Sequence, residues 1–279
     1  MKQKTLNFIK KYALKIFLGF WVICLIYSLF EVYWIEIKNN TIVNSQIPRS
    51  FDDTKVVFIS DIHSSAIFPA WQIRNIVNKV NNLEPDIIIL GWDYVEEWSD
   101  YVDICFNELK NLKAKYGIYA VLGNHDHRWW KDLILKKMNE SGIKLLENAN
   151  LALSKNNERI YIAWLTDLLY DYPDEKLALS WTTNKDFVLM VSHDPDIIEF
   201  EKDTRIDLMF SGHNHWWQVS FFGLRAGFRV PSFFWNKFRT WVTKIIDTYV
   251  LVSNWVWVNG LPIRFFARPQ INVIWLKSK

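Results

Sequence analysis

The chain has little glycine, little cysteine and almost no net charge. Its 279 residues include 9 Gly, whereas average usage of roughly 7% would give about twenty. The two cysteines, Cys24 in an apolar run and Cys105 in a predicted helix, form no CxxC pair, which excludes a thiolate metal site and makes a disulfide unfavourable. A net charge of +3 is far from the basic excess of a nucleic-acid-binding protein, so we expect no nucleic-acid partner.

Two common catalytic motifs are also missing. The sequence contains no Gly-x-Ser-x-Gly nucleophile elbow and no Gly-x-x-x-x-Gly-Lys phosphate loop. A serine hydrolase of the α/β type and a P-loop nucleotide-binding protein are therefore excluded. The length suits a single large α/β domain, and no internal repeat is present.

One long apolar run stands near the N-terminus. Ile16 to Phe30 carries no charge, and residues 12–14 extend it toward the ~20 residues of a membrane span if Lys15 snorkels to the headgroups. Five lysines precede the run and Glu31 follows it, which predicts a cytoplasmic N-terminus and an extracytoplasmic domain. A single-pass anchor is the favoured interpretation, and a cleaved signal peptide is the alternative.

The rest of the chain alternates strand and helix patterns. Short apolar runs predict buried strands at 55–60, 86–90 and 116–122, with helical spacing at 71–83, 101–113 and 131–138. The second half is richer in strands, expected at 151–153, 159–164, 187–192, 206–210, 248–253 and 271–276. This order predicts an α/β fold of sheets covered by helices. We expect an anchor at 1–31, a polar tether at 32–53 and the globular domain at 54–279.

Six histidines share one kind of position. Each follows a predicted strand and stands close to an Asp or Asn, at the sheet edge where open α/β sheets bind ligands. They are His63, His125, His127, His193, His213 and His215. The accompanying oxygen ligands are Asp61, Asp93, Asn124 and Asp126.

This donor set predicts a pair of metal ions. Neutral imidazoles mixed with carboxylate and amide oxygens suit Mn, Zn or Fe better than Mg or Ca. The donors are too many for one tetrahedral ion, so two divalent ions bridged by a carboxylate account for them best. Such ions lie roughly 3.5–4 Å apart and clamp both sides of a phosphoryl displacement.

The ordered segments DIH, GNHD, SHD and GHNH resemble the calcineurin-like metallophosphoesterase superfamily from about Lys55 to Leu276. The tail 261–269 (LPIRFFARP) looks like the branch of membrane-associated bacterial members. The resemblance implies a four-layer α-β-β-α sandwich of two mixed sheets flanked by helices. It makes 54–279 the phosphoesterase domain.

The resemblance also implies a role for each site residue. One ion would be held by Asp61, His63 and His215, the other by Asn124, His193 and His213, with Asp93 between them. A hydroxide between the metals would attack phosphorus. His125 would lie beside the scissile phosphate as an acid or charge stabiliser, with Asp126 orienting it, whereas His127 matches no family position.

Tryptophan stands where relatives have glycine at several of these motifs. The chain has 16 Trp against 9 Gly, and the positions concerned are Trp92, Trp164, Trp216, Trp217, Trp235, Trp255 and Trp257. Glycine serves positive φ or close backbone approach at such places, and overpacking costs typically about 1–3 kcal/mol per site. We expect that the source organism reads UGA as glycine, while the translation reads it as tryptophan. If the tryptophans are genuine, Trp216 and Trp217 line a mouth for a lipid substrate, or the site is blocked.

The sequence therefore predicts a membrane-anchored, metal-dependent phosphoesterase acting on a phosphodiester or pyrophosphate bond. A membrane tether and the family branch favour a phosphorylated small molecule or lipid, such as a lipid-linked or nucleotide-sugar substrate of the UDP-2,3-diacylglucosamine kind. The alternative from another class is a catalytically inactive, metal-holding interaction module on the membrane.

Overall fold

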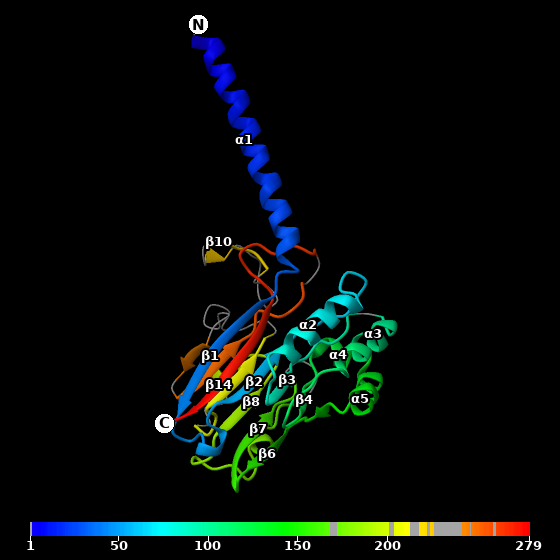
Figure 1. Cartoon of the computed structure of the whole chain (residues 1–279), viewed down its shortest axis with the longest axis vertical. Helices are drawn as coiled ribbons and strands as arrows, with labels where there is room; N and C mark the ends of the chain where they lie inside the picture. The colour runs from blue at the N-terminus through cyan, green and yellow to red at the C-terminus, as the bar shows by residue number, and fades with distance from the viewer. Residues whose placement is uncertain are drawn as a thin grey trace.

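A single long helix extends from an α/β domain. The computed structural model describes residues 2–96, 98–167, 172–200, 204–212, 218–221, 224–225, 242–245, 247–258 and 261–279. Helix α1 (Lys2–Glu31) points away from the rest of the protein (Figure 1). Its segment Lys11–Glu31 is long and apolar enough to cross a membrane, with a mean hydropathy of 2.1.

Two six-stranded sheets form the centre of the domain. The first has the order β1 (Glu36–Asn44), β14 (Gln270–Ser278), β2 (Thr54–Ile59), β3 (Ile87–Leu90), β4 (Ile118–Ala120) and β5 (Lys144–Leu145). The second has the order β12 (Val242–Ile245), β13 (Thr248–Val252), β9 (Leu208–Ser211), β8 (Val188–Val191), β7 (Glu158–Trp164) and β6 (Ala149–Lys155). A short pair, β10 (Ser220–Phe221) and β11 (Leu224–Arg225), stands apart from both.

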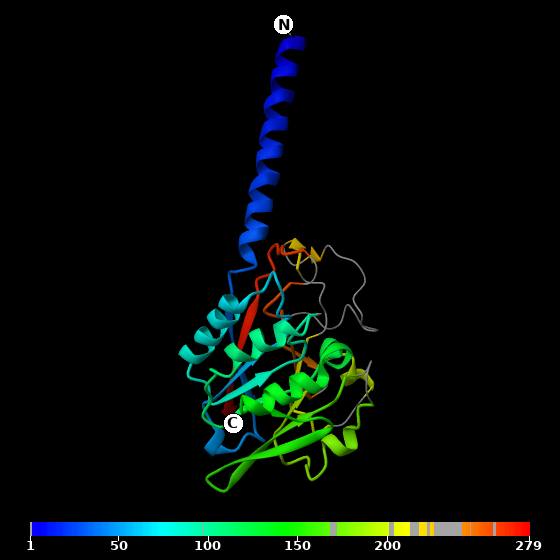
Figure 2. The same ribbon diagram turned by 90° about the vertical axis from the view of Figure 1, so that its right-hand side faces the viewer.

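Helices cover the outer faces of the two sheets. The longer ones pack on the first sheet: α2 (Ala70–Asn82), α3 (Asp100–Leu109) and α5 (Lys131–Glu140), with α4 (Asn124–Trp129) leading into α5 (Figure 2). Two short helices, α6 (Glu175–Ala178) and α7 (Ile197–Phe200), belong to the second sheet's side, and a 3-10 turn, η1, spans Arg49–Phe51. Between the sheets, Phe58 stacks on Phe210 with ring centroids 4.8 Å apart. The predicted four-layer sandwich of two mixed sheets is confirmed.

The central strands are buried on both faces, which explains their continuous apolar sequences. β3 (IIIL) and β8 (VLMV) are completely buried, and β2 pairs with β3 in parallel as β7 does with β8. Parallel strands covered on both sides have this composition because neither face meets water. The strands and helices expected between 55 and 276 are all present, with ends that differ by a few residues.

Residues 32–53 differ from the expected tether, because they contain β1. This strand pairs with β14 in parallel over nine residues, from Glu36 with Gln270 to Asn44 with Ser278. β1 lies at the edge of the sheet and most of its residues are partly or fully exposed, so its sequence is as polar as that of a linker. Its pairing partner comes from the opposite end of the chain, which local pattern does not reveal.

The register places the carboxyl end of β2 beside the start of β1. Asn272 of β14 pairs with both Lys38 and Phe58, and β14 runs antiparallel to β2. β1 begins five residues after α1 ends. The loops that follow the parallel strands of the first sheet therefore lie at the same end of the domain as the helix (Figure 1).

The last turns of α1 are packed into the domain. The buried Glu31 carboxylate accepts a hydrogen bond from the Ala267 amide (3.0 Å), and the Ser28 carbonyl accepts one from the Arg264 amide (2.9 Å). The guanidinium of Arg264, itself completely buried, donates to carbonyls of residues 254, 255, 257 and 267. The helix end and the segment 254–267 thus form one hydrogen-bonded unit.

Several tryptophans occupy positions that suit glycine. Trp255 is buried with φ +36° and Trp181 has φ +66°, a region that bulky residues rarely adopt. Trp92 and Trp164 are completely buried, and neither indole N–H has an acceptor within the described part of the chain. An unmet buried donor costs about 1–3 kcal/mol. Trp257 is also buried, whereas Trp216, Trp217 and Trp235 lie outside the described residues.

We expect the codons for Trp92, Trp164 and Trp255 in the source DNA to be TGA, read as glycine in that organism, because these sites hold an indole with a positive φ or with an N–H that has no acceptor among the described residues. The same codon is expected for Trp257, where the family pattern has glycine. Sequencing the gene tests this. Mass spectrometry of tryptic peptide 160–176 from native cells is the independent check, since it carries position 164. TGG codons together with a tryptophan mass at position 164 would contradict it.

Candidate metal centre

Loops from both sheets bring the predicted ligands together. Asp61 and His63 follow β2, Asp93 follows β3, Asn124 begins α4, and His193 follows β8. The first three and His193 are at most 2% exposed, and they converge at the carboxyl edge of the strands. The sequence predicted that these residues follow strands. The structure adds that the loops after the strands of both sheets meet at one end of the sandwich.

The backbone at three of these residues is left-handed. Asp61 has φ +56°, His63 +43° and Asp93 +55°. Such conformations cost about 1–3 kcal/mol each and persist where the surroundings enforce them. Here the Asp61 amide donates to the Trp92 carbonyl (3.1 Å) and the His63 amide to the Asp93 carbonyl (2.9 Å), so the two loops stay paired beyond the ends of β2 and β3.

Asp93 lies between two histidines. Its Oδ2 is 3.8 Å from His63 Nε2 and 3.5 Å from His193 Nε2. Ligand atoms of Asp61, Asp93 and His193 lie within 4.8 Å of one another. One carboxylate oxygen therefore faces donors from both sheets, which is the arrangement that a bridging ligand needs.

Asp126 holds the loop that carries Asp93 through hydrogen bonds to its backbone. Its Oδ2 accepts hydrogen bonds from the amides of Asp93 (2.7 Å) and Gly123 (3.0 Å), and its Oδ1 accepts one from Tyr94 (2.9 Å). The Asp93 Oδ1 in turn accepts one from the His125 amide (3.0 Å). These hydrogen bonds join the Asp93 loop to the start of α4, and the role of Asp126 in orienting His125 stays a prediction.

His125 stands at the edge of the cluster. Its side chain is 25% exposed, and its ring is perpendicular to that of His63 with centroids 4.8 Å apart. Burial lowers the pKa of His125 below its usual range, which favours the neutral ring. His127 points elsewhere, with Nε2 at 3.8 Å from Glu147.

Two more predicted ligands, His213 and His215, lie outside the described residues. Gly212, directly before His213, is described: its amide donates to the His193 carbonyl (3.2 Å), and a Cβ there would be 3.0 Å from Asp61 Oδ2. The chain therefore enters the cluster at this point. The Oδ1 of Asn124 is buried with no donor among the described residues, as suits an atom that binds a cation.

Two carboxylates were not predicted. Glu96 Oε2 lies 2.6 Å from His63 Nδ1, and Asp167 contacts His193 Nδ1. A carboxylate on one ring nitrogen fixes the tautomer and leaves Nε2 to bind a metal. Both carboxylates could have been found by the signal that identified the other site residues, namely a polar residue shortly after a predicted strand. Asp167 follows β7 by three residues, and Glu96 follows Asp93 by three.

Buried charges of opposite sign shift the pKa values. Burial and the neighbouring Asp93 raise the pKa of Asp61 to about 6. Burial acts against charge on Asp93 too, but His193 and His63 hold its pKa well below the usual range. Burial would lower the pKa of His63, yet Glu96 and Asp93 raise it to about 9. Carboxylates this close favour cations among them, so the oxygen and nitrogen donors present fit divalent metal ions.

Trp92 fills space that belongs to this cluster. Its ring lies 5.0 Å from that of His193, and a Cβ built on Gly123 or Gly212 would come 2.6 or 2.7 Å from Trp92 atoms. The Trp92 Cβ thus lies against Gly123, and its indole lies against Gly212.

Asp167→Asn is expected to weaken metal binding by roughly 10–100-fold, because the amide fixes the His193 tautomer less strongly than a carboxylate. Competition with a chromophoric chelator measures the affinity, and thermal unfolding shows that the variant is folded. Glu147→Gln is the matched control, since Glu147 pairs with Lys131 and His127 away from the cluster. An unchanged affinity in Asp167→Asn would exclude the positioning role.

Proteins of related sequence occur in bacteria and animals. An uncharacterized metallophosphoesterase, YkuE, of Bacillus subtilis is 29% identical over 254 residues, covering 89% of this chain and 87% of that protein. One of Aquifex aeolicus is 25% identical, covering 91% of this chain and 96% of its own. A transmembrane protein with a metallophosphoesterase domain from Danio rerio is 26% identical; the match covers 84% of this chain and 55% of that protein.

Among solved structures, a novel archaeal phosphodiesterase superposes with a TM-score of 0.40 and 15% identity, covering 71% of this chain and 82% of that chain. A family profile described as calcineurin-like phosphoesterase matches residues 54–217, which contain Asp61, Asp93, Asn124 and both histidine motifs of the second sheet. More than half of the chain is matched. The chain therefore belongs to the calcineurin-like phosphoesterase family, hydrolases of phosphoester bonds.

Proposed function

We propose that this phosphoesterase uses two divalent ions, Mn, Zn or Fe, to hydrolyse a phosphodiester or pyrophosphate bond. The observation that carries the proposal is the place of Asp93, whose Oδ2 faces Nε2 of both His63 and His193. Each imidazole is backed by its own carboxylate, Glu96 or Asp167. This is a donor set for two ions that share one oxygen.

The residues divide the work between two sides of Asp93. Asp61, His63 and His215 would hold one ion, and Asn124, His193 and His213 would hold the other. When bound, the ions supply Lewis acidity and lower the pKa of water. Water oxygen forms the new bond to phosphorus as the bond to the leaving oxygen breaks, and the leaving oxygen takes up a proton. His125, neutral and partly exposed, stabilises charge on the phosphoryl group or passes that proton.

Helix α1 supports a membrane location for this activity. Lys11–Glu31 has the length and hydropathy of a span, and the Danio rerio relative is named a transmembrane protein. Lysines before the apolar run favour a cytoplasmic N-terminus and an extracytoplasmic catalytic domain. The membrane location favours a lipid-linked or nucleotide-sugar phosphate as substrate, of the UDP-2,3-diacylglucosamine kind.

Asp93→Ala is expected to lower turnover of bis-p-nitrophenyl phosphate with Mn²⁺ by roughly a hundredfold or more, because the shared oxygen is lost. Removing metal with a chelator is expected to have the same effect on the unmodified protein, and Mn²⁺ to restore activity. Asp103→Ala is the control, since that carboxylate is 59% exposed and pairs with Lys137.

The assay is best made with glycine at the seven tryptophan positions as well as with the sequence given, so that a blocked site is recognised. Turnover that resists the chelator would contradict a two-metal mechanism. A folded glycine form that binds Mn²⁺ without turnover would favour the metal-holding interaction module.

A further inference from the structure

Exposed apolar side chains surround the base of α1. They form what we call the anchor-end face: Tyr33, Trp34, Trp71, Leu261 and Phe266, each between 46% and 70% exposed. These residues come from three separate segments of the chain, and two of the segments contact α1 or follow it directly. Single exposed apolar residues are common, but a group of aromatic rings around a membrane helix resembles the aromatic belt at a bilayer surface.

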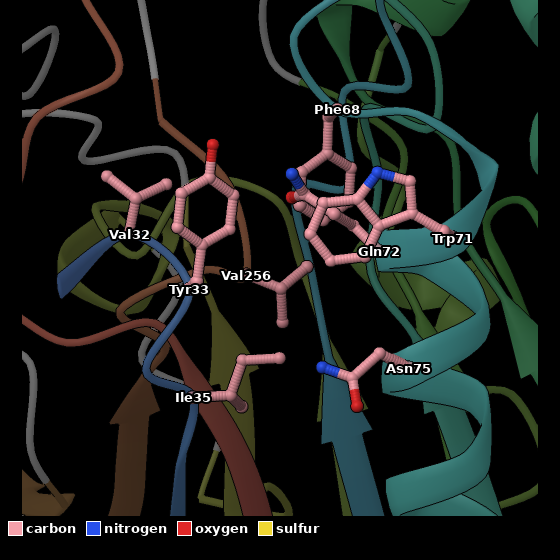
Figure 3. A pocket seen from close by; sticks show the side chains of 8 residues that line it. All are labelled: Val32, Tyr33, Ile35, Phe68, Trp71, Gln72, Asn75 and Val256. Carbon is pink, nitrogen blue, oxygen red and sulfur yellow. The ribbon is translucent and has the colours of Figure 1, made fainter. Parts of the chain in front are cut away.

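The aromatic rings on this face are fixed rather than loose. Tyr33 stacks on Trp71 with centroids 5.9 Å apart, and the Arg268 guanidinium lies 4.4 Å from the Trp34 ring centroid. A cavity of about 20 Å³ lies beneath Tyr33 and Trp71, also lined by Phe68 and Val256 (Figure 3). It has room for a single water molecule. The pair therefore offers an outward surface and no small-molecule pocket.

The anchor-end face is held in position relative to the membrane helix. Tyr27, inside the apolar segment of α1, lies 5.5 Å from both Phe265 and Phe266 by ring centroid. The hydrogen bonds from Ala267 to Glu31 and from Arg264 to Ser28 prevent this loop from swinging away. Phe266 is consequently placed at the depth of the last turns of α1, where the bilayer's apolar core meets its headgroups, and Leu261 belongs to the same segment.

The segment 254–267, which contacts the end of α1, also contacts the loops of the candidate metal centre. The Val256 amide donates to the Ser60 carbonyl (3.2 Å), next to Asp61. The Phe265 amide donates to the carbonyl of Gln218 (2.7 Å), three residues after His215. The anchor-end face and the metal ligands are thus joined by short backbone contacts at one end of the domain.

We infer that the anchor-end face docks on the lipid bilayer and that the metal centre hydrolyses the phosphate group of a lipid held in that bilayer. The substrate class is an amphiphile with a phosphodiester or pyrophosphate headgroup, and its hydrolysis consumes one water. The bilayer is the occupant because the face is continuous with a membrane-spanning helix and carries aromatic and cationic side chains together. This inference rests on the proposed function for the reaction itself.

Docking is tested with the full chain in vesicles of phosphatidylethanolamine and phosphatidylglycerol that contain a lipid-borne quencher. In a Cys24→Ser background, Leu261→Cys carries an environment-sensitive fluorophore; Cys105 is buried. Val43→Cys is the matched control, an apolar residue 47% exposed and roughly 23 Å from Glu36 along β1 at ~3.3 Å per residue. If the face docks on the bilayer, the fluorophore at position 261 is expected to show blue-shifted emission that the lipid-borne quencher reduces, and the fluorophore at position 43 is not.

Equal, unquenched emission at both positions, as when a protein partner covers the face, would overturn docking.

The substrate class is tested with hexadecyl p-nitrophenyl phosphate in these vesicles and with water-soluble bis-p-nitrophenyl phosphate. The double variant Leu261→Ser with Phe266→Ser is expected to lose roughly tenfold activity on the hexadecyl ester only, because two apolar contacts with the bilayer are removed. Equal loss on both esters would overturn the lipid substrate. If the unsubstituted protein cleaves neither ester, the proposed function fails, while the quenching result still decides docking.

Discussion

The site depends on one buried carboxylate that is bonded from every side. Asp93 meets imidazoles from both sheets through Oδ2, accepts the His125 amide through Oδ1, and has its own amide held by Asp126. Burying an isolated carboxylate costs free energy, so Asp93 stays ionised only because these partners compensate its charge. Because these partners come from three segments, after β2, at the start of α4 and after β8, the carboxylate fixes the segments relative to one another. The left-handed backbone at Asp61, His63 and Asp93 is the strain that this convergence requires.

Much of this follows from sequence because the relevant signals are local. Continuous apolar runs identify strands buried on both faces, and polar residues directly after them must meet at one sheet edge. Asp61, Asp93 and His193 were found in this way. Glu96 and Asp167 were not, since an acid after a strand becomes informative only when its distance to a histidine is known. β1 was missed for a related reason: its partner, β14, is more than two hundred residues away in the chain.

For some of the tryptophans, the family pattern and the structure point independently to glycine. The family resemblance implies the positions where glycine is expected, and the structure shows what an indole contacts at the described ones. Trp255 lies in the left-handed region, while Trp92 is pressed between the loops of Gly123 and Gly212. The fold accommodates both of these rings, and the backbone of Trp255 is in the region that glycine favours. Among the described residues, Trp92 lies beside the candidate ligand His193, and Asp61, Asp93 and His193 remain close to one another.

The position of β14 sets the order in which this protein can fold. The last strand inserts between β1, which follows the membrane helix, and β2, so the first sheet stays incomplete until residues 270–278 have been synthesised. The apolar helix and β1 are synthesised before the strand that completes the sheet, so β1 has no partner in this sheet until β14 is made. β14 joins β1 to β2, and this pairing places the helix that precedes β1 at the same end of the domain as the loop that carries Asp61 and His63.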